Sequence, residues 1–143
     1  SDPHIYAAGD IAAWPDPTFN RQLRVEHWDV AFNQGYVAGS NMAGADQVYD
    51  ALPYFFSDIF DVSFEVWGDL NDWDQTVQRG SLEDRKVAFY YFNQGTLVGV
   101  LAMGRPDDER EPMQALVKMG AAYDNVGAHL ADEGTRLTEL LKG

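Results

Sequence analysis

The chain has 143 residues, of which 45% are hydrophobic and 13% aromatic, so it is long and apolar enough to bury a core. Ten basic residues against 23 acidic ones give a net charge of −13, which excludes nucleic-acid binding by bulk electrostatics and opposes adsorption to an anionic membrane surface. The sequence holds no cysteine, which excludes disulfides and thiol chemistry within it and favours a cytoplasmic protein.

The first third of the sequence predicts a strand, a loop and a helix. Residues 4–8 form a short apolar run before Gly9-Asp10, which is typical of a buried strand followed by a tight turn. The two prolines within residues 14–17 predict a loop. Residues 26–42 predict a helix, because apolar and small residues recur at helical spacing. Its expected buried face carries Trp28, Ala31, Phe32, Gly35, Ala38, Gly39 and Met42.

The remainder of the sequence predicts an antiparallel sheet followed by helices. Residues 45–53 resemble a linker, and we expect two domains, residues 1–45 and 46–143. An aromatic segment over residues 54–60 precedes apolar and polar alternation over residues 62–67, which predicts a strand, and residues 76–79 predict a short edge strand. Two apolar runs, 86–92 and 96–103, are joined by Asn93-Gln94-Gly95 and predict a β-hairpin. A helix after Pro106, a short turn over 124–131 and a last helix over 135–141 follow.

The sequence offers no self-contained catalytic or metal site. His4, His27 and His129 are far apart and lack metal-ligand spacing. The acidic loop over residues 69–74 is similar to a calcium-binding loop, but Trp73 and Gly80 stand where that loop needs ligands. Phosphate-binding glycine loops and nucleophile elbows are also missing from the sequence. We therefore assign no catalytic acid, base or nucleophile.

Three segments resemble the flavoprotein reductases that have two dinucleotide-binding domains. Ser1–Asp10 resembles their second FAD-binding motif, a strand ending in Gly-Asp. Arg24–Ala31 is similar to the segment that opens the long helix near the flavin ring in the ferredoxin-reductase and apoptosis-inducing-factor branch. Pro53–Asp58 resembles the aromatic-aromatic-Ser-Asp stretch that opens the C-terminal domain of that branch, in a form similar to monodehydroascorbate-reductase-like members.

The resemblance implies cofactor contacts for six residues. It implies that Gly9 lets the backbone approach FAD and that Asp10 accepts a hydrogen bond from a ribityl hydroxyl. Glu26, His27 and Trp28 would open a helix whose N-terminus faces the N1/C2=O edge of the flavin and stabilises its anionic reduced form. Phe56 replaces a residue that is often Trp beside the flavin or nicotinamide ring. From the residues alone, an ordinary core position is favoured for Trp28, and for Phe56 it is as compatible as a contact with the ring.

The resemblance also implies a fold and an activity. The expected fold is α+β: an antiparallel sheet of three to five strands with packed C-terminal helices, preceded by a strand and a helix of an FAD-binding α/β domain. The parent protein would pass electrons from NAD(P)H through FAD to a ferredoxin, a rubredoxin, a quinone or a small oxidised metabolite. Because the first FAD motif and the NAD(P)H-binding region are missing from this sequence, we expect the chain by itself to bind FAD weakly and to be inactive.

A second interpretation is a non-enzymatic module. In it, the aromatic surface over residues 54–60 mediates dimerisation or the docking of a partner protein. Exposed apolar surface at Trp28, Phe32, Phe55 and Phe56 would favour a symmetric homodimer.

Overall fold

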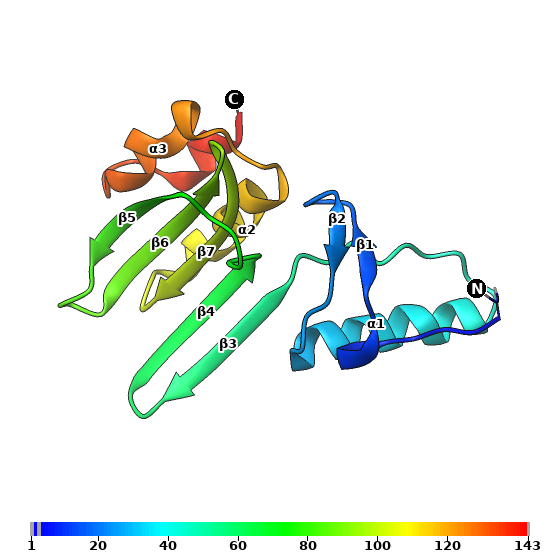
Figure 1. The fold of residues 1–143 in the computed structure, drawn as a ribbon. Coiled ribbons are helices and arrows are strands. Elements are labelled where there is room, and N and C mark those ends of the chain that lie inside the picture. Colours follow the sequence, from blue (N-terminus) through cyan, green and yellow to red (C-terminus); the bar gives the residue numbers. More distant parts are fainter. Residues whose placement is uncertain (1, 3, 143) are drawn as a thin grey trace. The chain divides into compact units, whose positions relative to one another are not determined.

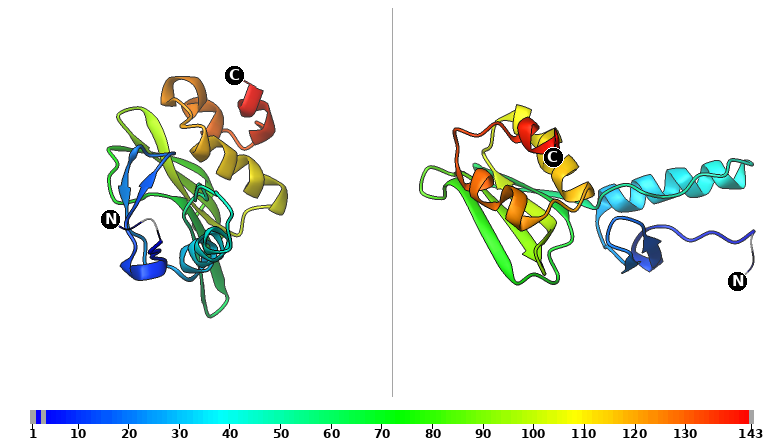
Figure 2. Two further views of the ribbon diagram at one scale, coloured as in Figure 1. Left: turned by 90° about the vertical axis from the view of Figure 1, so that its right-hand side faces the viewer. Right: turned by 90° about the horizontal axis from the view of Figure 1, so that it is seen from above.

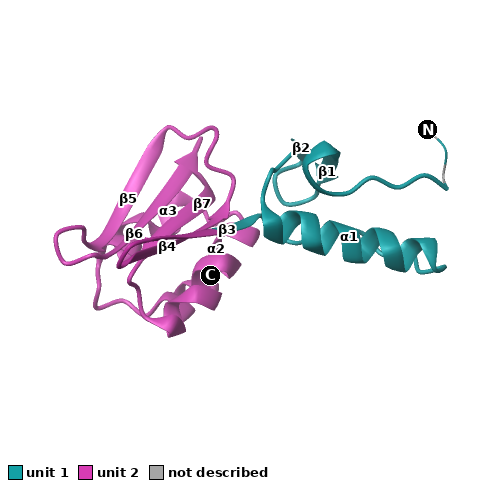
Figure 3. Ribbon diagram, turned by 90° about the horizontal axis from the view of Figure 1, so that it is seen from below, with its two compact units in different colours: residues 1–55 teal, residues 56–143 magenta. Residues whose placement is uncertain are grey.

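The computed structural model describes every residue except Ser1, Pro3 and Gly143, so the head of the first motif lies outside the described residues. The chain divides into two compact units, residues 1–55 (unit 1) and residues 56–143 (unit 2) (Figure 3). These units meet within one strand, whereas the predicted domains divide at residues 45 and 46, in an irregular segment. That domain division remains a prediction.

Unit 1 consists of a short turn, a small hairpin and one long helix (Figure 1). The turn is the 3₁₀ helix η1 (Gly9–Ile11), the hairpin pairs β1 (Trp14–Asp16) with β2 (Arg21–Leu23), and the helix is α1 (Trp28–Met42). The structure contradicts the strand predicted over residues 4–8, which are irregular and mostly exposed. No described strand lies beside that run, so its backbone has no ladder to join.

The loop predicted over residues 14–17 is also wrong, because residues 14–16 form β1. Pro15 lies opposite Gln22 in a sheet of only two strands. Each strand of such a sheet is an edge, where a missing N–H need not break a ladder bond. The proline is therefore tolerated, and the sequence rule that excluded a strand there does not apply.

The core of unit 1 is small and aromatic. Trp14, Leu23 and Val30 are its buried centre, with Phe19, Val25 and Tyr49 packed around them. The rings of Trp14 and Tyr49 meet edge to face at a centroid distance of 5.3 Å. Burial, with smaller contributions from nearby carboxylates, raises the pKa of Tyr49 to about 12. The hairpin and α1 are thus held together by one compact apolar cluster.

The predicted helix forms, but its buried face is not the predicted one. Val30 and Gln34 are the buried residues of α1. Trp28, Phe32, Tyr36 and Met42 are exposed instead, at 72%, 61%, 67% and 70% of their surface. Helical spacing identifies an apolar face, but it does not determine which face finds a partner.

Unit 2 contains the predicted antiparallel sheet, now with five strands in the order β3-β4-β7-β6-β5. The strands are β3 (Tyr54–Ile59), β4 (Val62–Gly68), β5 (Gln75–Ser81), β6 (Lys86–Asn93) and β7 (Thr96–Met103). β5 lies at an edge, as predicted, and β6 and β7 form the predicted hairpin. Gly95 in its turn has φ +77°, a conformation that glycine adopts without steric cost.

Helices cover one face of this sheet (Figure 2). After the 3₁₀ turn η2 (Asp107–Glu109) come α2 (Arg110–Lys118), α3 (Tyr123–Ala131) and the 3₁₀ helix η3 (Leu137–Lys142). The predicted turn over 124–131 is a full helix, and the last predicted helix is of the 3₁₀ type. Met113, Leu116 and Val117 of α2 are fully buried, as their spacing predicted. The α+β fold class is therefore confirmed.

Across the described residues, no helix has the length and apolarity needed to cross a membrane.

We expect amide hydrogen exchange to separate the β6–β7 hairpin from the N-terminal run. Both hairpin strands lie inside the sheet, and Val87, Tyr90 and Val100 are fully buried, so their amides should open only in global or near-global unfolding. Residues 5–8 belong to no described helix or strand and should exchange rapidly. Peptide-resolved mass spectrometry measures both regions at once. Slow exchange at residues 5–8 in a monomeric sample would contradict this expectation.

Candidate functional site

Gly9 begins a turn that fits directly against helix α1. Its backbone has φ +76°, and a Cβ atom added there would lie 3.3 Å from the Cβ of Ala31. Its buried N–H donates a 2.9 Å hydrogen bond to Oε1 of Gln34. Both the dihedral angle and the close approach therefore require glycine at this position. The close neighbour of Gly9 in the structure is therefore α1. An approach of the Gly9 backbone to FAD remains a prediction.

Asp10 follows Gly9 and projects from this turn. The residue is exposed, and within the described part of the chain its carboxylate makes no hydrogen bond or ion pair. Its backbone carbonyl accepts a 3.1 Å hydrogen bond from Nη1 of Arg24, and Arg24 also pairs with Glu26 at 2.5 Å. Glu26 is thus engaged with a neighbouring side chain, whereas the Asp10 carboxylate is available to a ligand.

The N-terminus of α1 lies within one helical turn of the Gly9 contact. His27 is the N-cap, in an extended conformation and without a side-chain cap hydrogen bond. Its carbonyl accepts the first intrahelical hydrogen bond, from the N–H of Ala31 at 3.0 Å. The amides of residues 28–30 precede that bond and have no acceptor within the helix. A helix start of this kind carries partial positive charge, which suits an electron-rich ligand edge.

Aromatic contacts flank this helix start within unit 1. The imidazole of His27 stacks on the ring of Phe55, with centroids 4.6 Å apart and planes at 24°. Trp28 and Phe32 stack on each other with centroids 5.4 Å apart, and both remain mostly exposed. The alternative that Trp28 packs in a core of this chain is therefore wrong. The structure brings Gly9 against the first turn of the helix that His27 and Trp28 open.

Phe56 belongs to the other compact unit. Phe56 is the third residue of β3, and 51% of its surface is exposed. It is therefore not a core residue of unit 2. A contact between Phe56 and a flavin or nicotinamide ring remains a prediction.

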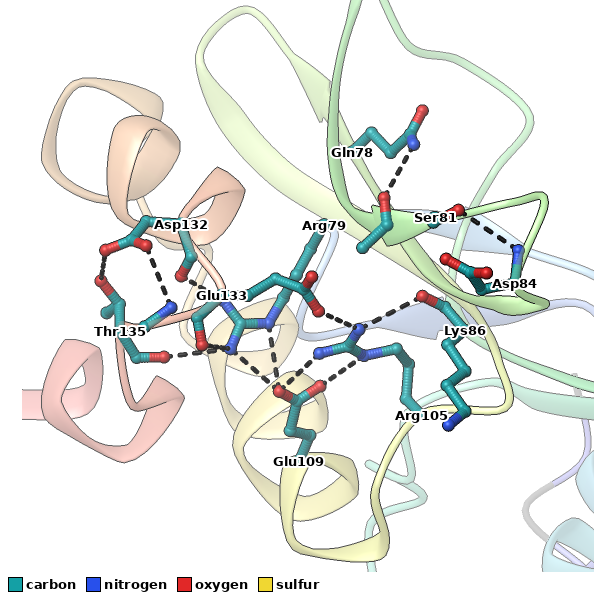
Figure 4. Close-up of polar contacts among 12 residues, drawn as sticks. Gln78, Arg79, Ser81, Asp84, Lys86, Arg105, Glu109, Asp132, Glu133 and Thr135 are labelled. Atoms are coloured by element: carbon teal, nitrogen blue, oxygen red, sulfur yellow. Dashed lines mark hydrogen bonds and ion pairs between the residues drawn. The ribbon is translucent and has the colours of Figure 1, made fainter.

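Unit 2 contains a buried cluster of ion pairs among Arg79, Arg105 and Glu109 (Figure 4). The sequence analysis did not identify this cluster. Arg79 of β5 is 3% exposed, and its Nε and Nη2 donate to Oε1 of Glu109 at 3.1 and 2.9 Å. Arg105 donates to both carboxylate oxygens of Glu109, each at 2.8 Å, and to Glu133 at 2.8 Å. Burial alone would raise the pKa of Glu109, but the hydrogen bonds from Arg105 and Arg79 hold that pKa below its ordinary value.

Arg79 also binds the backbone of the C-terminal segment. Its Nη1 and Nη2 donate to the carbonyls of Leu130, Asp132, Glu133 and Thr135, at distances between 2.5 and 3.4 Å. Its polar hydrogens therefore all point at protein acceptors, and the cluster organises the fold instead of binding an anion. The sequence could have revealed this burial, because Arg79 lies two residues after Val77 in β5 and therefore on the same, buried face of the strand.

Within the described residues, no group of three His, Asp or Glu side chains is placed to hold a metal ion.

Comparison with known proteins identifies the second part of the chain. Residues 54–141 match the family described as Reductase C-terminal. The chain belongs to this family. The match begins with β3 and includes the whole sheet and the helices that cover it. With the relatives named below, it shows that the sequence corresponds to the C-terminal part of FAD-dependent pyridine nucleotide-disulfide oxidoreductases.

Individual relatives extend the similarity to unit 1. The chain is 33% identical over 143 residues to monodehydroascorbate reductase from Pisum sativum, covering 94% of the chain and 32% of that protein. It is 39% identical over 80 residues to the ferredoxin–NAD(+) reductase component of the anthranilate 1,2-dioxygenase system of Burkholderia cepacia, covering 56% of the chain and 20% of that protein. The solved ferredoxin reductase for the CYP199A2 system of Rhodopseudomonas palustris matches with a TM-score of 0.81 and 26% identity, over 96% of the chain and 33% of that structure. The chain thus spans a third or less of the length of these reductases.

Replacing Glu109 with Gln should destabilise the family domain by about 3 kcal/mol, because buried Arg79 would lose its counter-charge and Arg105 would keep only Glu133. Glu111→Gln is the matched control: it makes the same substitution two residues later, at an exposed position, and should change stability by less than about 0.5 kcal/mol. Urea unfolding followed by tryptophan fluorescence measures both. Equal stability of the two variants would contradict the importance of the buried cluster.

The same cluster predicts a loss of stability in acid. The folded-state pKa of Glu109 lies below the ordinary value of 4.5 at which it titrates in the unfolded chain. A lowered pKa stabilises the folded state fully above pH 4.5, and this contribution declines as the pH falls through the folded-state value. The difference in unfolding free energy between the wild type and Glu109→Gln should therefore shrink between pH 7 and about pH 3. A difference in unfolding free energy that does not change with pH would contradict the lowered pKa of Glu109 in the folded state.

Proposed function

We propose that this chain is the C-terminal segment of an NAD(P)H-dependent FAD oxidoreductase and that it helps to position the flavin. Membership of the Reductase C-terminal family supports the oxidoreductase assignment. The observation that carries the positioning role is the Gly9–Asp10 turn, packed against the first turn of helix α1. Through Gly9, this turn lies against the first turn of the helix, so Asp10 follows a residue that contacts the start of α1.

The residues present fit a flavin. Asp10 supplies an exposed carboxylate with no partner among the described residues, the acceptor that a ribityl hydroxyl requires. The backbone at Gly9 has no side chain to obstruct a ligand, and a Cβ atom there would be in tight contact with Ala31. The amides that open α1 supply partial positive charge for the electron-rich N1/C2=O edge of the ring.

The bound flavin would supply hydride acceptance and electron transfer, and the chain would supply orientation and charge. Asp10 would hold the ribityl chain by accepting its hydroxyl hydrogen bond. The amides of Trp28 and Asp29, which open α1 and keep exposed surface, would stabilise negative charge at the nearby ring edge, which raises the tendency of the ring to accept electrons. Neither role requires an acid, base or nucleophile from this segment.

The names of the relatives favour particular electron partners. One relative is a ferredoxin–NAD(+) reductase component, and one solved structure is a ferredoxin reductase. We infer that the complete protein takes electrons from NADH and passes them to a ferredoxin-type protein. A small oxidised metabolite is the alternative acceptor, because another relative is a monodehydroascorbate reductase.

A second candidate function is a non-enzymatic docking or dimerisation module. The exposed apolar stripe of α1, formed by Trp28, Phe32, Tyr36 and Met42, favours it, because apolar patches of this kind are often covered by a partner. The two candidates differ in a simple observation on the complete protein: a reductase purifies with visible flavin absorbance, and a docking module does not.

Replacing Asp10 with Asn should weaken FAD binding by the complete protein about 10- to 100-fold, because a hydrogen bond to a charged acceptor is replaced by a weaker, neutral one. Asp46→Asn is the control, since Asp46 is also an exposed aspartate of unit 1 but lies beyond the end of α1. Flavin-fluorescence titration of the flavin-free protein measures both affinities. An affinity for FAD that is the same in both variants and the wild type would refute the proposed role of Asp10.

A further inference from the structure

The side chain of Gln34 makes a contact that the proposed flavin site depends on. Gln34 lies on the buried face of α1, one turn after Val30, and only 7% of its surface is exposed. Its Oε1 accepts the N–H of Gly9 at 2.9 Å, although the two residues are 25 positions apart. This is a buried, long-range hydrogen bond that the backbone of a turn donates to a polar side chain.

The turn at Gly9 is held to the helix at two points. The first point is Ala31, against which the backbone of Gly9 packs. The contact is close, because a Cβ atom added at Gly9 would lie only 3.3 Å from the Cβ of Ala31. Gln34, three residues further along the helix, fixes the direction in which the Gly9 amide points. Without Gln34, the Gly9 N–H would be buried with no acceptor, and the turn would rotate or open to reach water.

We propose that Gln34 is a positioning residue for FAD: it fixes the Gly9 amide and thereby holds the turn that carries Asp10 against the first turn of α1. This inference rests on the proposed flavin-positioning function. Gln34 does not itself touch the cofactor in this proposal. It acts through Asp10, the next residue after the one that it binds.

The first test concerns the turn alone and needs no flavin. In the 143-residue chain, Gln34→Leu removes the acceptor while keeping a side chain of similar volume, so exchange of the Gly9 amide should accelerate about tenfold or more. Gln47→Leu is the matched control at an exposed glutamine of the same unit. Gln34→Asn is a second variant, whose side chain is one methylene too short to reach Gly9. Unchanged exchange of Gly9 in a folded Gln34 variant would overturn the proposal.

The second test asks whether Gln34 acts through Asp10. FAD affinity is measured for the flavin-free complete protein as the wild type, Gln34→Leu, Asp10→Asn and the double variant. We expect Gln34→Leu to weaken binding about tenfold in the wild type but less than about twofold when Asp10 is already replaced. An equal loss in both backgrounds would show that Gln34 acts through general stability, and would overturn the proposal.

The two tests separate failure of this inference from failure of the proposed function. If Asp10→Asn binds FAD as the wild type does, the proposed flavin role of Asp10 is refuted, and the route from Gln34 through it is refuted as well. The exchange of Gly9 would still decide whether Gln34 holds the turn. If Asp10→Asn weakens binding but Gln34→Leu does not, only the positioning role of Gln34 is overturned.

Discussion

A guanidinium group buried under the sheet of unit 2 constrains most of that unit. Arg79 comes from the edge strand β5, yet almost none of its surface reaches solvent. A buried cation must be matched by charge and by hydrogen-bond acceptors, or it destabilises the fold severely. Glu109 provides the charge from the turn before α2, and four carbonyls between residues 130 and 135 provide the remaining acceptors. The strand, the start of α2 and the segment after α3 are therefore ordered by one side chain.

Unit 1 uses a neutral version of the same arrangement. A buried amide side chain on α1 accepts a backbone N–H from a turn far away in the sequence, and a glycine allows the two backbones to approach. The consequence differs, because the Asp10 carboxylate next to this junction is exposed and has no hydrogen-bond partner among the described residues. In unit 2 the polar groups bind one another, whereas in unit 1 a carboxylate and a helix start remain available.

Local patterns in the sequence predicted the parts of the fold that local forces determine. The β6–β7 hairpin follows from two apolar runs around Asn93-Gln94-Gly95, and the buried face of α2 follows from residue spacing. The failures share one cause. The run over residues 4–8 has the composition of a strand but no described neighbour, and the apolar face of α1 has no cover. Composition shows that a segment can be buried, but burial needs a partner that the sequence of the segment does not encode. Gln34 and Arg79 were missed for a related reason, since their partners lie 25 to 56 residues away.

The distance along the chain between Arg79 and its acceptors has a consequence for biosynthesis. The carbonyls that Arg79 binds lie 51 to 56 residues after it. During translation, β5 is made and can leave the ribosome well before those residues exist, so its arginine has no buried acceptors to bind at that stage. Closing a loop of that length costs entropy before any contact repays it. The sheet can therefore reach its final packed form only after residues 130–135 have been synthesised, and their docking onto Arg79 is a late step in assembly of the domain.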